Sequence, residues 1–328
     1  MSRRGWVLFV AMGVIWGTPY LFIKEAVDSF APATVVCVRT LGAALLLLPV
    51  AARTGALRPA LARWPWVLGF GAIEMAGPFM LLSDAEKTLP SGLTGLLVST
   101  VPLVAAVVGF AGGDRGALDA TRVAGLVVGI AGVALVVGGG GDGTVGVVAV
   151  AEVLLTAVCY AVAPFIVVRR LGDVPALGPI TLSLGAVGLA YLPVAMATQD
   201  GAPTGRSIAA VVALAILCTA LAFVVFFALI AEVGPTRAPL ITYVNPVVAL
   251  ALGVAVLDEQ VTTAMLVGIP LVLAGCWFAA GVGRHGSRPP AGGPTTEALL
   301  TPGAWPPEAP EATGTDGTGG SPDAHVAS

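Results

Sequence analysis

The stretch that decides the fold is residues 242–275, TYVNPVVALALGVAVLDEQVTTAMLVGIPLVLAG. It consists of an apolar segment with a proline near its start, an acidic pair at Asp258 and Glu259, and a second apolar segment. Long apolar runs separated by a short polar stretch are typical of helices joined by a turn. This stretch therefore predicts a hairpin of two apolar helices.

An earlier stretch repeats this layout. Residues 99–132 read STVPLVAAVVGFAGGDRGALDATRVAGLVVGIAG. With one residue of slip, the two stretches correspond at Pro102 and Pro246, Asp114 and Asp258, Gly125 and Gly268, and Gly132 and Gly275. The tetrapeptide LPVA also occurs twice, at 48–51 and at 192–195. Such repeats indicate a chain built from two related halves.

The composition is that of an integral membrane protein. Hydrophobic residues make up 57% of the 328 residues and charged residues only 11%, whereas about 25% charged is usual in soluble domains. The mean hydropathy is +0.94. A soluble fold is excluded, because it could not cover this much apolar surface.

The sequence offers little material for a metal site or for enzymatic chemistry. The four cysteines lie in separate apolar segments without metal-ligand spacing, as expected of small buried side chains. Both histidines, His285 and His325, fall at or beyond the end of the last apolar segment. The sequence also lacks P-loop, GxSxG and HExxH motifs. We therefore expect no metal and no cofactor, and a protein that is not an enzyme.

The apolar runs predict ten membrane spans at about twenty residues per crossing. Their expected limits are 6–23, 32–51, 64–83, 91–111, 120–139, 145–168, 176–197, 207–231, 237–256 and 262–282. The expected fold class is an all-α integral membrane protein with ten transmembrane helices in two inverted five-helix repeats. The first repeat is 1–140 and the second 141–285, with a glycine-rich linker between them. Residues 286–328, rich in Pro, Gly and Thr, are expected to be a disordered cytoplasmic tail.

The distribution of positive charge supports this topology. With the N-terminus inside, twelve arginines fall on the cytoplasmic side, and Lys24, Lys87 and Arg206 fall on the outer side. This is a strong positive-inside bias. Each half has five spans, an odd number, so the second half must enter the membrane from the opposite side. The expected location is the plasma (inner) membrane, multi-pass, with both termini cytoplasmic.

Three ionisable residues fall inside the predicted spans: Glu74, Glu152 and Arg39. Charged groups within a membrane are costly, so they are candidates for a functional role. The alternative is a buried ion pair or a polar contact that specifies the fold. We expect Glu74 and Glu152 to line a translocation path as readily as to be structural, whereas for Arg39 the structural interpretation is favoured.

Polar and aromatic residues near these acids complete a candidate site. Thr156 and Tyr160 lie on the helix face of Glu152, and Trp16 and Tyr20 share a face of the first span. Tyr243 and Asn245 come just before Pro246 in the ninth span. Side chains at this spacing also occur on ordinary packing faces. The candidate substrate-binding residues are Glu74, Glu152, Trp16, Tyr20, Thr156, Tyr160, Tyr243 and Asn245.

Prolines interrupt corresponding spans of the two halves. The expected helix kinks are at Pro19, Pro78, Pro102, Pro164 and Pro246. Each proline removes a helical hydrogen bond, and paired interruptions of this kind indicate a binding site where two inverted halves meet. Simple helix bending is the alternative. At the span ends, Asp114, Asp258 and Glu259 are expected to favour the N-termini of the fifth and tenth spans.

These features together resemble the drug/metabolite transporter superfamily, in its EamA-like ten-helix form, over residues 6–282. The resemblance rests on Trp16-Gly17, on Pro32 with Arg39, on Pro246 followed by Asp258-Glu259, and on Gly268 with Gly275. The first half departs from the pattern, with Asp114-Arg115 where Glu-Arg is usual. The resemblance implies a secondary transporter with alternating access and a central cavity that Glu74 and Glu152 would face.

The predicted function is a secondary transporter that moves small metabolites, amino acids or drugs across the plasma membrane, as an exporter. Many members of the family export such compounds in exchange for protons. The expected partners are a small-molecule substrate, protons and membrane lipid, and no nucleic acid; the sequence selects no oligomeric state. Two alternatives remain open: a membrane-embedded lipid-handling enzyme and a non-transporting membrane scaffold.

Overall fold

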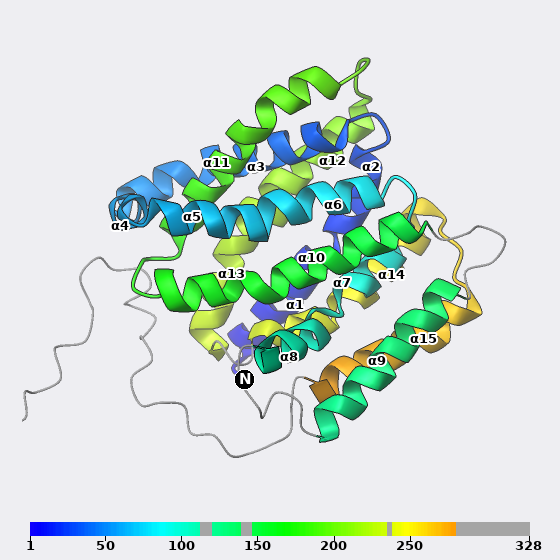
Figure 1. The fold of residues 1–328 in the computed structure, drawn as a ribbon. Helices are drawn as coiled ribbons and strands as arrows, with labels where there is room; N and C mark the ends of the chain where they lie inside the picture. The colour runs from blue at the N-terminus through cyan, green and yellow to red at the C-terminus, as the bar shows by residue number, and fades with distance from the viewer. Residues whose placement is uncertain (112–119, 139–145, 235–237, 280–328) are drawn as a thin grey trace, which may run out of the picture.

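A computed structural model describes residues 1–111, 120–138, 146–234 and 238–279, and within these ranges all regular structure is helical (Figure 1). The first half contains α1 (Arg3–Gly17), α2 (Pro19–Ala26), α3 (Pro32–Arg53), α4 (Leu57–Ala62), α5 (Trp64–Gly71), η1 (Ala72–Ala76), α6 (Gly77–Ala85), α7 (Ser91–Val98), α8 (Val101–Ala111) and α9 (Ala120–Gly138). The second contains α10 (Val147–Ile166), η3 (Val167–Leu171), α11 (Leu177–Thr198), α12 (Gly205–Ala215), η4 (Ile216–Leu221), α13 (Ala222–Val233), η5 (Ala238–Tyr243), α14 (Asn245–Leu257) and α15 (Thr263–Ala279).

Successive helices join into long apolar rods. In the described part of the chain, nine rods are long and apolar enough to cross a membrane. They are Arg3–Ala26, Pro32–Arg53, Trp64–Ala85, Ser91–Ala111, Ala120–Gly138, Val147–Leu171, Leu177–Thr198, Gly205–Val233 and Leu240–Leu257. Each lies within a few residues of a predicted span. The tenth predicted span corresponds to α15, which is apolar but shorter. The short helix α4 was not predicted.

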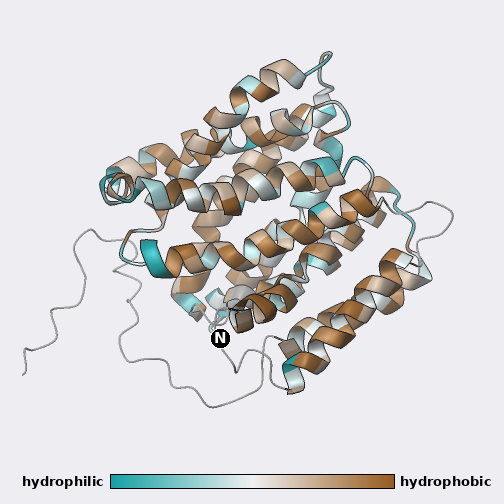
Figure 2. Cartoon of the chain, in the orientation of Figure 1, coloured by the Kyte–Doolittle hydropathy of each residue, from teal (hydrophilic) through white to brown (hydrophobic). Residues whose placement is uncertain are grey.

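The outside of the bundle is apolar along the helices. In Figure 2, hydrophobic residues surround the rods, whereas hydrophilic residues gather at helix ends and in the connections. Val7, Leu45, Val147 and Met196 are each more than 60% exposed, at 68%, 69%, 82% and 78%. Apolar surface of this extent is stable in contact with lipid, so the hydropathy and the structure agree on a multi-pass membrane protein.

Helices at corresponding places in the two halves pack against each other. α3 contacts α11, α9 contacts α15, and α7 contacts α14. Other contacts between the halves join non-corresponding rods: α6 of the third rod contacts α10 of the sixth, while α1 and α2 of the first rod contact α13 and α12 of the eighth. One buried cluster combines Leu96 and Leu97 of α7 with Val153 of α10 and Leu214 of α12. The hydrophobic core therefore lies between the halves and not within either one.

The rods are irregular at corresponding depths. α1 ends before Pro19 and α7 ends before Pro102, and η5 gives way to α14 just before Pro246. The third rod of each half contains a π-helical turn, η1 before Pro78 and η4 at residues 216–221, and a further π-helical turn, η3, follows Pro164. Each irregularity frees backbone groups, which must find partners within the protein because lipid has none. The Tyr191 hydroxyl provides one such partner, donating to the carbonyl of Ala76 in η1 at 3.0 Å.

The acidic turn after α14 differs from the sequence expectation. Asp258 adopts a left-handed backbone conformation with φ of 55°, and the Glu259 carboxylate lies against the start of α7. There it accepts hydrogen bonds from the backbone nitrogens of Ser91 (2.6 Å) and Gly92 (3.1 Å). The expectation that Glu259 caps its own following helix is therefore wrong. That end of α15 is capped by the Thr262 hydroxyl, which accepts from the nitrogen of Met265 at 3.2 Å.

Some predicted features lie outside the described residues. They are Asp114, the glycine run at 139–143 and the tail at 286–328. The expected limits of the two repeats at 140 and 285 fall in the same unassigned regions. The boundaries between the repeats and the tail therefore remain sequence-based predictions.

Glycines let α9 and α15 approach closely at one edge of the bundle (Figure 1). A Cβ atom on Gly275 would lie 2.5 Å from both the Cα and the nitrogen of Gly129, and 2.6 Å from the carbonyl oxygen of Gly125. These neighbours are backbone atoms, so neither helix could yield without moving away from the other. Small residues at a helix crossing are how membrane helices reach this separation.

Gly275→Ala is therefore expected to destabilise the protein. Overpacking of this kind costs about 1–3 kcal/mol, which would lower the melting temperature of the detergent-purified protein by several degrees. The matched control is Gly69→Ala in α5, where no described atom lies within 4 Å of the added Cβ. The control should melt at or above the wild-type temperature, because alanine is the better helix former. Equal melting of Gly275→Ala and wild type would contradict the close contact.

Candidate substrate-binding site

Arg39 of α3 is a buried cation in the middle of the bundle. Its side chain is only 6% exposed. The Nε atom donates to the hydroxyl of Thr219 in η4 at 2.9 Å, and the guanidinium carbon lies 3.8 Å from the ring centre of Phe79 in α6. Among the described residues, no ion pair includes Arg39. The charge is thus stabilised by a hydroxyl and the face of an aromatic ring, and no carboxylate neutralises it.

The π-helical turn η4 positions the partner of Arg39. The Thr219 hydroxyl donates to the carbonyl of Leu214, five residues earlier, at 2.8 Å, while accepting from Arg39. Next to it, the Cys218 sulfur lies 3.2 Å from the hydroxyl of Thr18, at the break between α1 and α2. Isolated π turns within helices are frequent at functional sites. Here one π turn connects the interruption of the first rod to the buried arginine of the second.

Two tyrosines lie within electrostatic range of this cation, and an acidic residue lies near one of them. Tyr20 of α2 is buried, Tyr160 of α10 is partly buried, and Glu74 of η1 is half-buried. Tyr160 lies within electrostatic range of Glu74, Arg39 and Tyr20. We call Tyr20, Arg39, Glu74 and Tyr160 the central polar cluster. It combines one cationic group, one acidic group and two phenols from both halves of the chain, a set that can bind a small molecule carrying opposite charges.

The structure places Glu152 apart from this cluster, whereas Thr156 lies about one helical turn before Tyr160 in the same helix. Glu152 lies in hydrogen-bonding contact with Asp84, whose carboxylate also pairs with Lys87 at 3.2 Å. Asp84 is ten residues beyond Glu74 in the same rod, a separation of about 15 Å along a helix. The hydroxyl of the fully buried Thr156 donates to the Glu152 carbonyl of its own helix at 3.0 Å. The two acids predicted to share one site therefore occupy different depths.

The remaining predicted residues have local partners. The Trp16 ring packs against Phe226 of α13, with ring centres 4.7 Å apart. Tyr243 faces α15, where its ring centre lies 5.9 Å from that of Trp277. In the orientation that satisfies its neighbours, the Asn245 amide donates to the carbonyls of Ile241 (3.0 Å) and Gly13 (3.2 Å). Asn245 therefore braces the irregular start of α14 against α1.

Sequence reasoning missed several residues that the structure makes prominent. Thr219 and Cys218 form the one polar pair in the run AILCTALAFVV, which is the signal that could have indicated them. Phe79 gave no signal, because a phenylalanine in an apolar helix is ordinary. Glu86 was overlooked because DAEK, residues 84–87, reads as an exposed loop, yet its side chain is fully buried.

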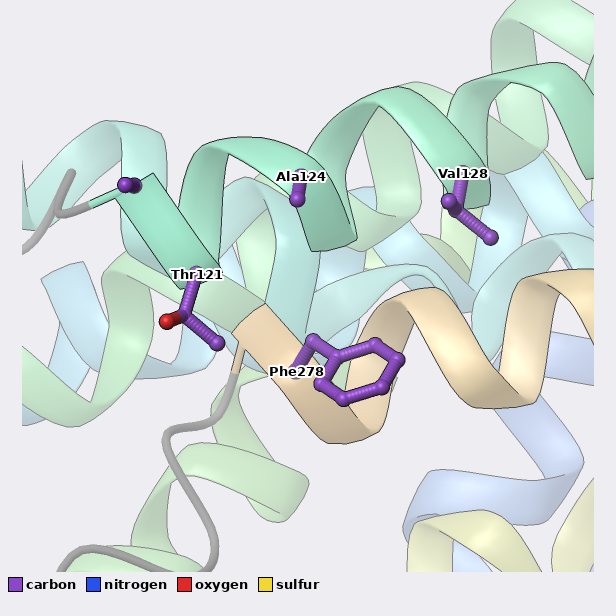
Figure 3. A pocket seen from close by; sticks show the side chains of 5 residues that line it. Thr121, Ala124, Val128 and Phe278 are labelled. Atoms are coloured by element: carbon purple, nitrogen blue, oxygen red, sulfur yellow. The ribbon is translucent and has the colours of Figure 1, made fainter.

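A shallow groove lies between α9 and α15. Ala124 and Val128 of α9 and Phe278 of α15 line it together with Ala120 and Thr121 (Figure 3). Its lining is almost entirely apolar and lies on the peripheral helix pair. Such a groove suits lipid chains, and it lacks the charged groups that the central polar cluster offers to a polar ligand.

Comparisons with known proteins agree with this architecture. The model of the EamA-like transporter family matches the chain twice, at residues 3–138 and 147–281. An uncharacterized transporter of Bacillus subtilis, YvbV, is 25% identical over 280 residues, covering 83% of this chain and 90% of that protein. A probable terminal-alkyne amino-acid exporter of Streptantibioticus cattleyicolor is 26% identical over 278 residues, covering 84% and 92%. A crystal structure with 22% identity superposes with a TM-score of 0.59, over 85% of this chain and 97% of that one, which supports the fold.

Thr219→Val tests the support of the buried arginine. The variant keeps the side-chain shape but removes both the acceptor for Arg39 and the donor to Leu214. A buried group that loses its partner costs about 1–3 kcal/mol, so the melting temperature should fall by several degrees. Thr198→Val is the matched control, because its hydroxyl also donates to a helix carbonyl, at 2.8 Å, but is exposed. Identical melting of the two variants would show that the Arg39 contact contributes nothing.

Proposed function

Because the chain belongs to the EamA-like transporter family, we propose that it is a secondary transporter that exports a small amphipathic or zwitterionic metabolite across the plasma membrane by alternating access. The single observation that supports this best is the central polar cluster, which both halves contribute and which lies beside interrupted helices. Membership of a transporter family also disfavours the lipid-handling enzyme and the scaffold that the sequence left open.

The two halves are proposed to be inverted repeats of five spans each, with α15 as the tenth span. Two observations support this. The family model matches each half separately, and the second, fourth and fifth rods of the first half each contact the corresponding rod of the second half, α3 with α11, α7 with α14 and α9 with α15. An odd number of spans per half requires opposite orientations, and the arginine-rich loops favour cytoplasmic termini. A transporter of this design can open to either side by the same motion of either half.

Polar contacts at both ends of one helix pair are suited to such a motion. At one end, Glu232 of α13 accepts from the Ser2 hydroxyl at 2.5 Å and lies 3.9 Å from Arg4. At the other end, Glu25 of α2 pairs with Arg206 of α12. Exposed ion pairs contribute little free energy, so either set can open at small cost. The rods, which touch each other through apolar contacts, would then rock around the central polar cluster.

The chemistry of the cluster favours amino acids among the candidate substrates. Arg39 offers a cation that can bind a carboxylate, and Glu74 offers an acidic group that can bind an ammonium. Tyr20 and Tyr160 supply rings and hydroxyls between them. One relative is named as a probable exporter of an amino acid, which agrees with this assignment. We therefore propose Arg39 and Glu74 as the two groups that orient the substrate. Trp16, four residues before Tyr20 in the first rod, is the aromatic residue next to them in sequence.

Transport into proteoliposomes tests this proposal. The purified protein would be reconstituted and assayed for uptake of a panel of radiolabelled amino acids, with Glu74→Gln and Arg39→Lys beside wild type. Losing a charge-assisted hydrogen bond costs about 1.5–3 kcal/mol, which corresponds to roughly 10- to 150-fold weaker transport at low substrate concentration.

Asp173→Asn is the control for this assay. Asp173 pairs with Arg63 at the surface, at 2.7 Å, and half of its side chain is exposed, so the variant should transport like wild type. Full transport by Glu74→Gln would remove Glu74 from substrate binding. If wild-type protein transports none of the panel, the amino-acid assignment is wrong.

A further inference from the structure

Glu86, directly after α6, is a fully buried carboxyl group without a hydrogen-bond partner. Its exposed fraction is 0%, and neither side-chain oxygen has a partner within the described ranges. An ionised carboxylate in such a place costs several kcal/mol. Burial therefore raises the pKa of Glu86 well above its ordinary value, with the charge of Glu259 adding to the effect. Burial in this conformation therefore favours the protonated form of the carboxyl group.

The nearest cation does not neutralise this carboxyl group directly. Lys24 of α2 donates from Nζ to the main-chain carbonyls of Glu86 (2.7 Å) and Leu89 (3.0 Å). Its three donors are thus turned toward the end of α6, and no ion pair forms with the Glu86 side chain among the described residues. The Lys24 charge still lowers the pKa of Glu86, but by less than burial raises it.

Other charged and titratable groups face Glu86 from the surrounding elements. They are Tyr20 of α2, Arg39 of α3 and Glu259 at the end of α14. Glu259 is held by the backbone nitrogens of Ser91 and Gly92, so its charge stays beside the start of α7. On the same rod as Glu86, Asp84 and Lys87 pair with each other and lie next to Glu152 of α10. Glu86 is therefore in electrostatic contact with the central polar cluster through Arg39 and Tyr20.

The elements that bury Glu86 belong to contacts that alternating access must break. α2 starts at the interruption of the first rod and packs on α6 and α7. It is held to the second half by the Glu25–Arg206 pair, and α7 is held there by Glu259. Separation of the halves at this end would expose Glu86 to water. Its proton could then leave, because hydration favours the charged carboxylate.

We propose that Glu86 is a proton-binding site that is occupied while α2 and α7 are packed against the second half and is emptied when this end of the protein opens. The step is a simple acid dissociation: the carboxylic acid gives its proton to water and becomes a carboxylate. The link to opening rests on the alternating access proposed above, whereas proton binding in the closed form does not. A transporter with this site would release one proton each time this end opens and bind one each time it closes.

Melting temperature against pH tests proton binding without any substrate. A carboxyl group whose pKa is higher in the folded than in the unfolded protein stabilises the fold at low pH, and this stabilisation is lost as pH rises from the ordinary value to the raised one. Glu86→Gln cannot ionise, so its melting temperature should exceed that of wild type by a margin that grows by several degrees as pH rises. The exposed Asp173→Asn should follow the wild-type curve. A constant difference between Glu86→Gln and wild type would overturn the proposal.

A second variant covers the case in which Glu86→Gln does not fold. Lys24→Gln keeps a donor for the two carbonyls but removes the positive charge that favours ionised Glu86. Its pH-dependent loss of stability should therefore move to higher pH than in wild type. An unchanged or lower midpoint would contradict the assignment of the titration to Glu86.

Hydrogen exchange measures the coupling to opening. In the wild type, after correction for intrinsic rates, amides of α2 and α7 should exchange faster at high pH than at low pH, and in Glu86→Gln they should stay protected. Equal protection at both pH values in the wild type would show that the proton does not hold this end closed. If added sodium ions increase the protection of these amides at constant pH, the site binds a metal cation and not a proton, and the proposal is wrong. If the wild-type protein transports no tested compound but its stability still depends on pH through Glu86, the transport proposal is wrong and the proton site stands.

Discussion

The structure depends on the requirement that every backbone polar group inside a membrane has a partner within the protein. Uninterrupted helices meet this requirement alone. Interrupted helices meet it only where neighbours supply the missing partners. The Tyr191 hydroxyl binds a carbonyl in η1, the Thr219 hydroxyl binds one in η4, and the Asn245 amide binds two near the start of α14. At these three interruptions, the partners come from side chains that pack between the helices.

The same requirement locates the polar side chains. A group that satisfies a freed carbonyl is itself polar and buried, and it can hold another polar group beside it. Thr219 illustrates this, since its hydroxyl donates to the carbonyl of Leu214 and accepts from Arg39. Within the part of the chain that the structure describes, the interior thus acquires a cation that forms no ion pair and lies near two phenols, one of which is close to Glu74. An unsatisfied charge set of this kind is costly for a merely structural core and useful for a transporter, whose ligand can complete it.

Contacts between the halves divide into two kinds with different energetic roles. The glycine-lined crossing of α9 with α15 is close and apolar, so it resists separation. The contacts at the ends of the central rods are polar: Glu232 with Ser2 and Arg4, Glu25 with Arg206, and Glu259 with the start of α7. Water can replace such partners when an end opens, at little cost in free energy. These two kinds of contact agree with the proposed mechanism, in which the central rods would rock while the peripheral pair stays packed.

Much of the fold could be predicted from the sequence, because membrane spans are a local property. The length of an apolar run determines whether a helix can cross the bilayer, and the observed rods agree with the predicted limits to within a few residues. Proline positions are a weaker guide to interruptions, since η4 contains no proline and Pro49 and Pro193 lie within continuous helices. The family resemblance, which rested on short motifs, was confirmed by the match of the family model to both halves.

Only the tertiary structure decided which charges meet. Glu152 and Glu74 have equivalent signals in the sequence, yet packing of α10 against α6 places one beside Asp84 and the other in the central polar cluster. Glu259 reads as a cap for the helix that follows it, but the left-handed turn at Asp258 directs it to α7. Glu86 reads as part of an exposed loop and is completely buried. Burial and pairing depend on neighbours that are distant in the chain, so no local pattern could specify them.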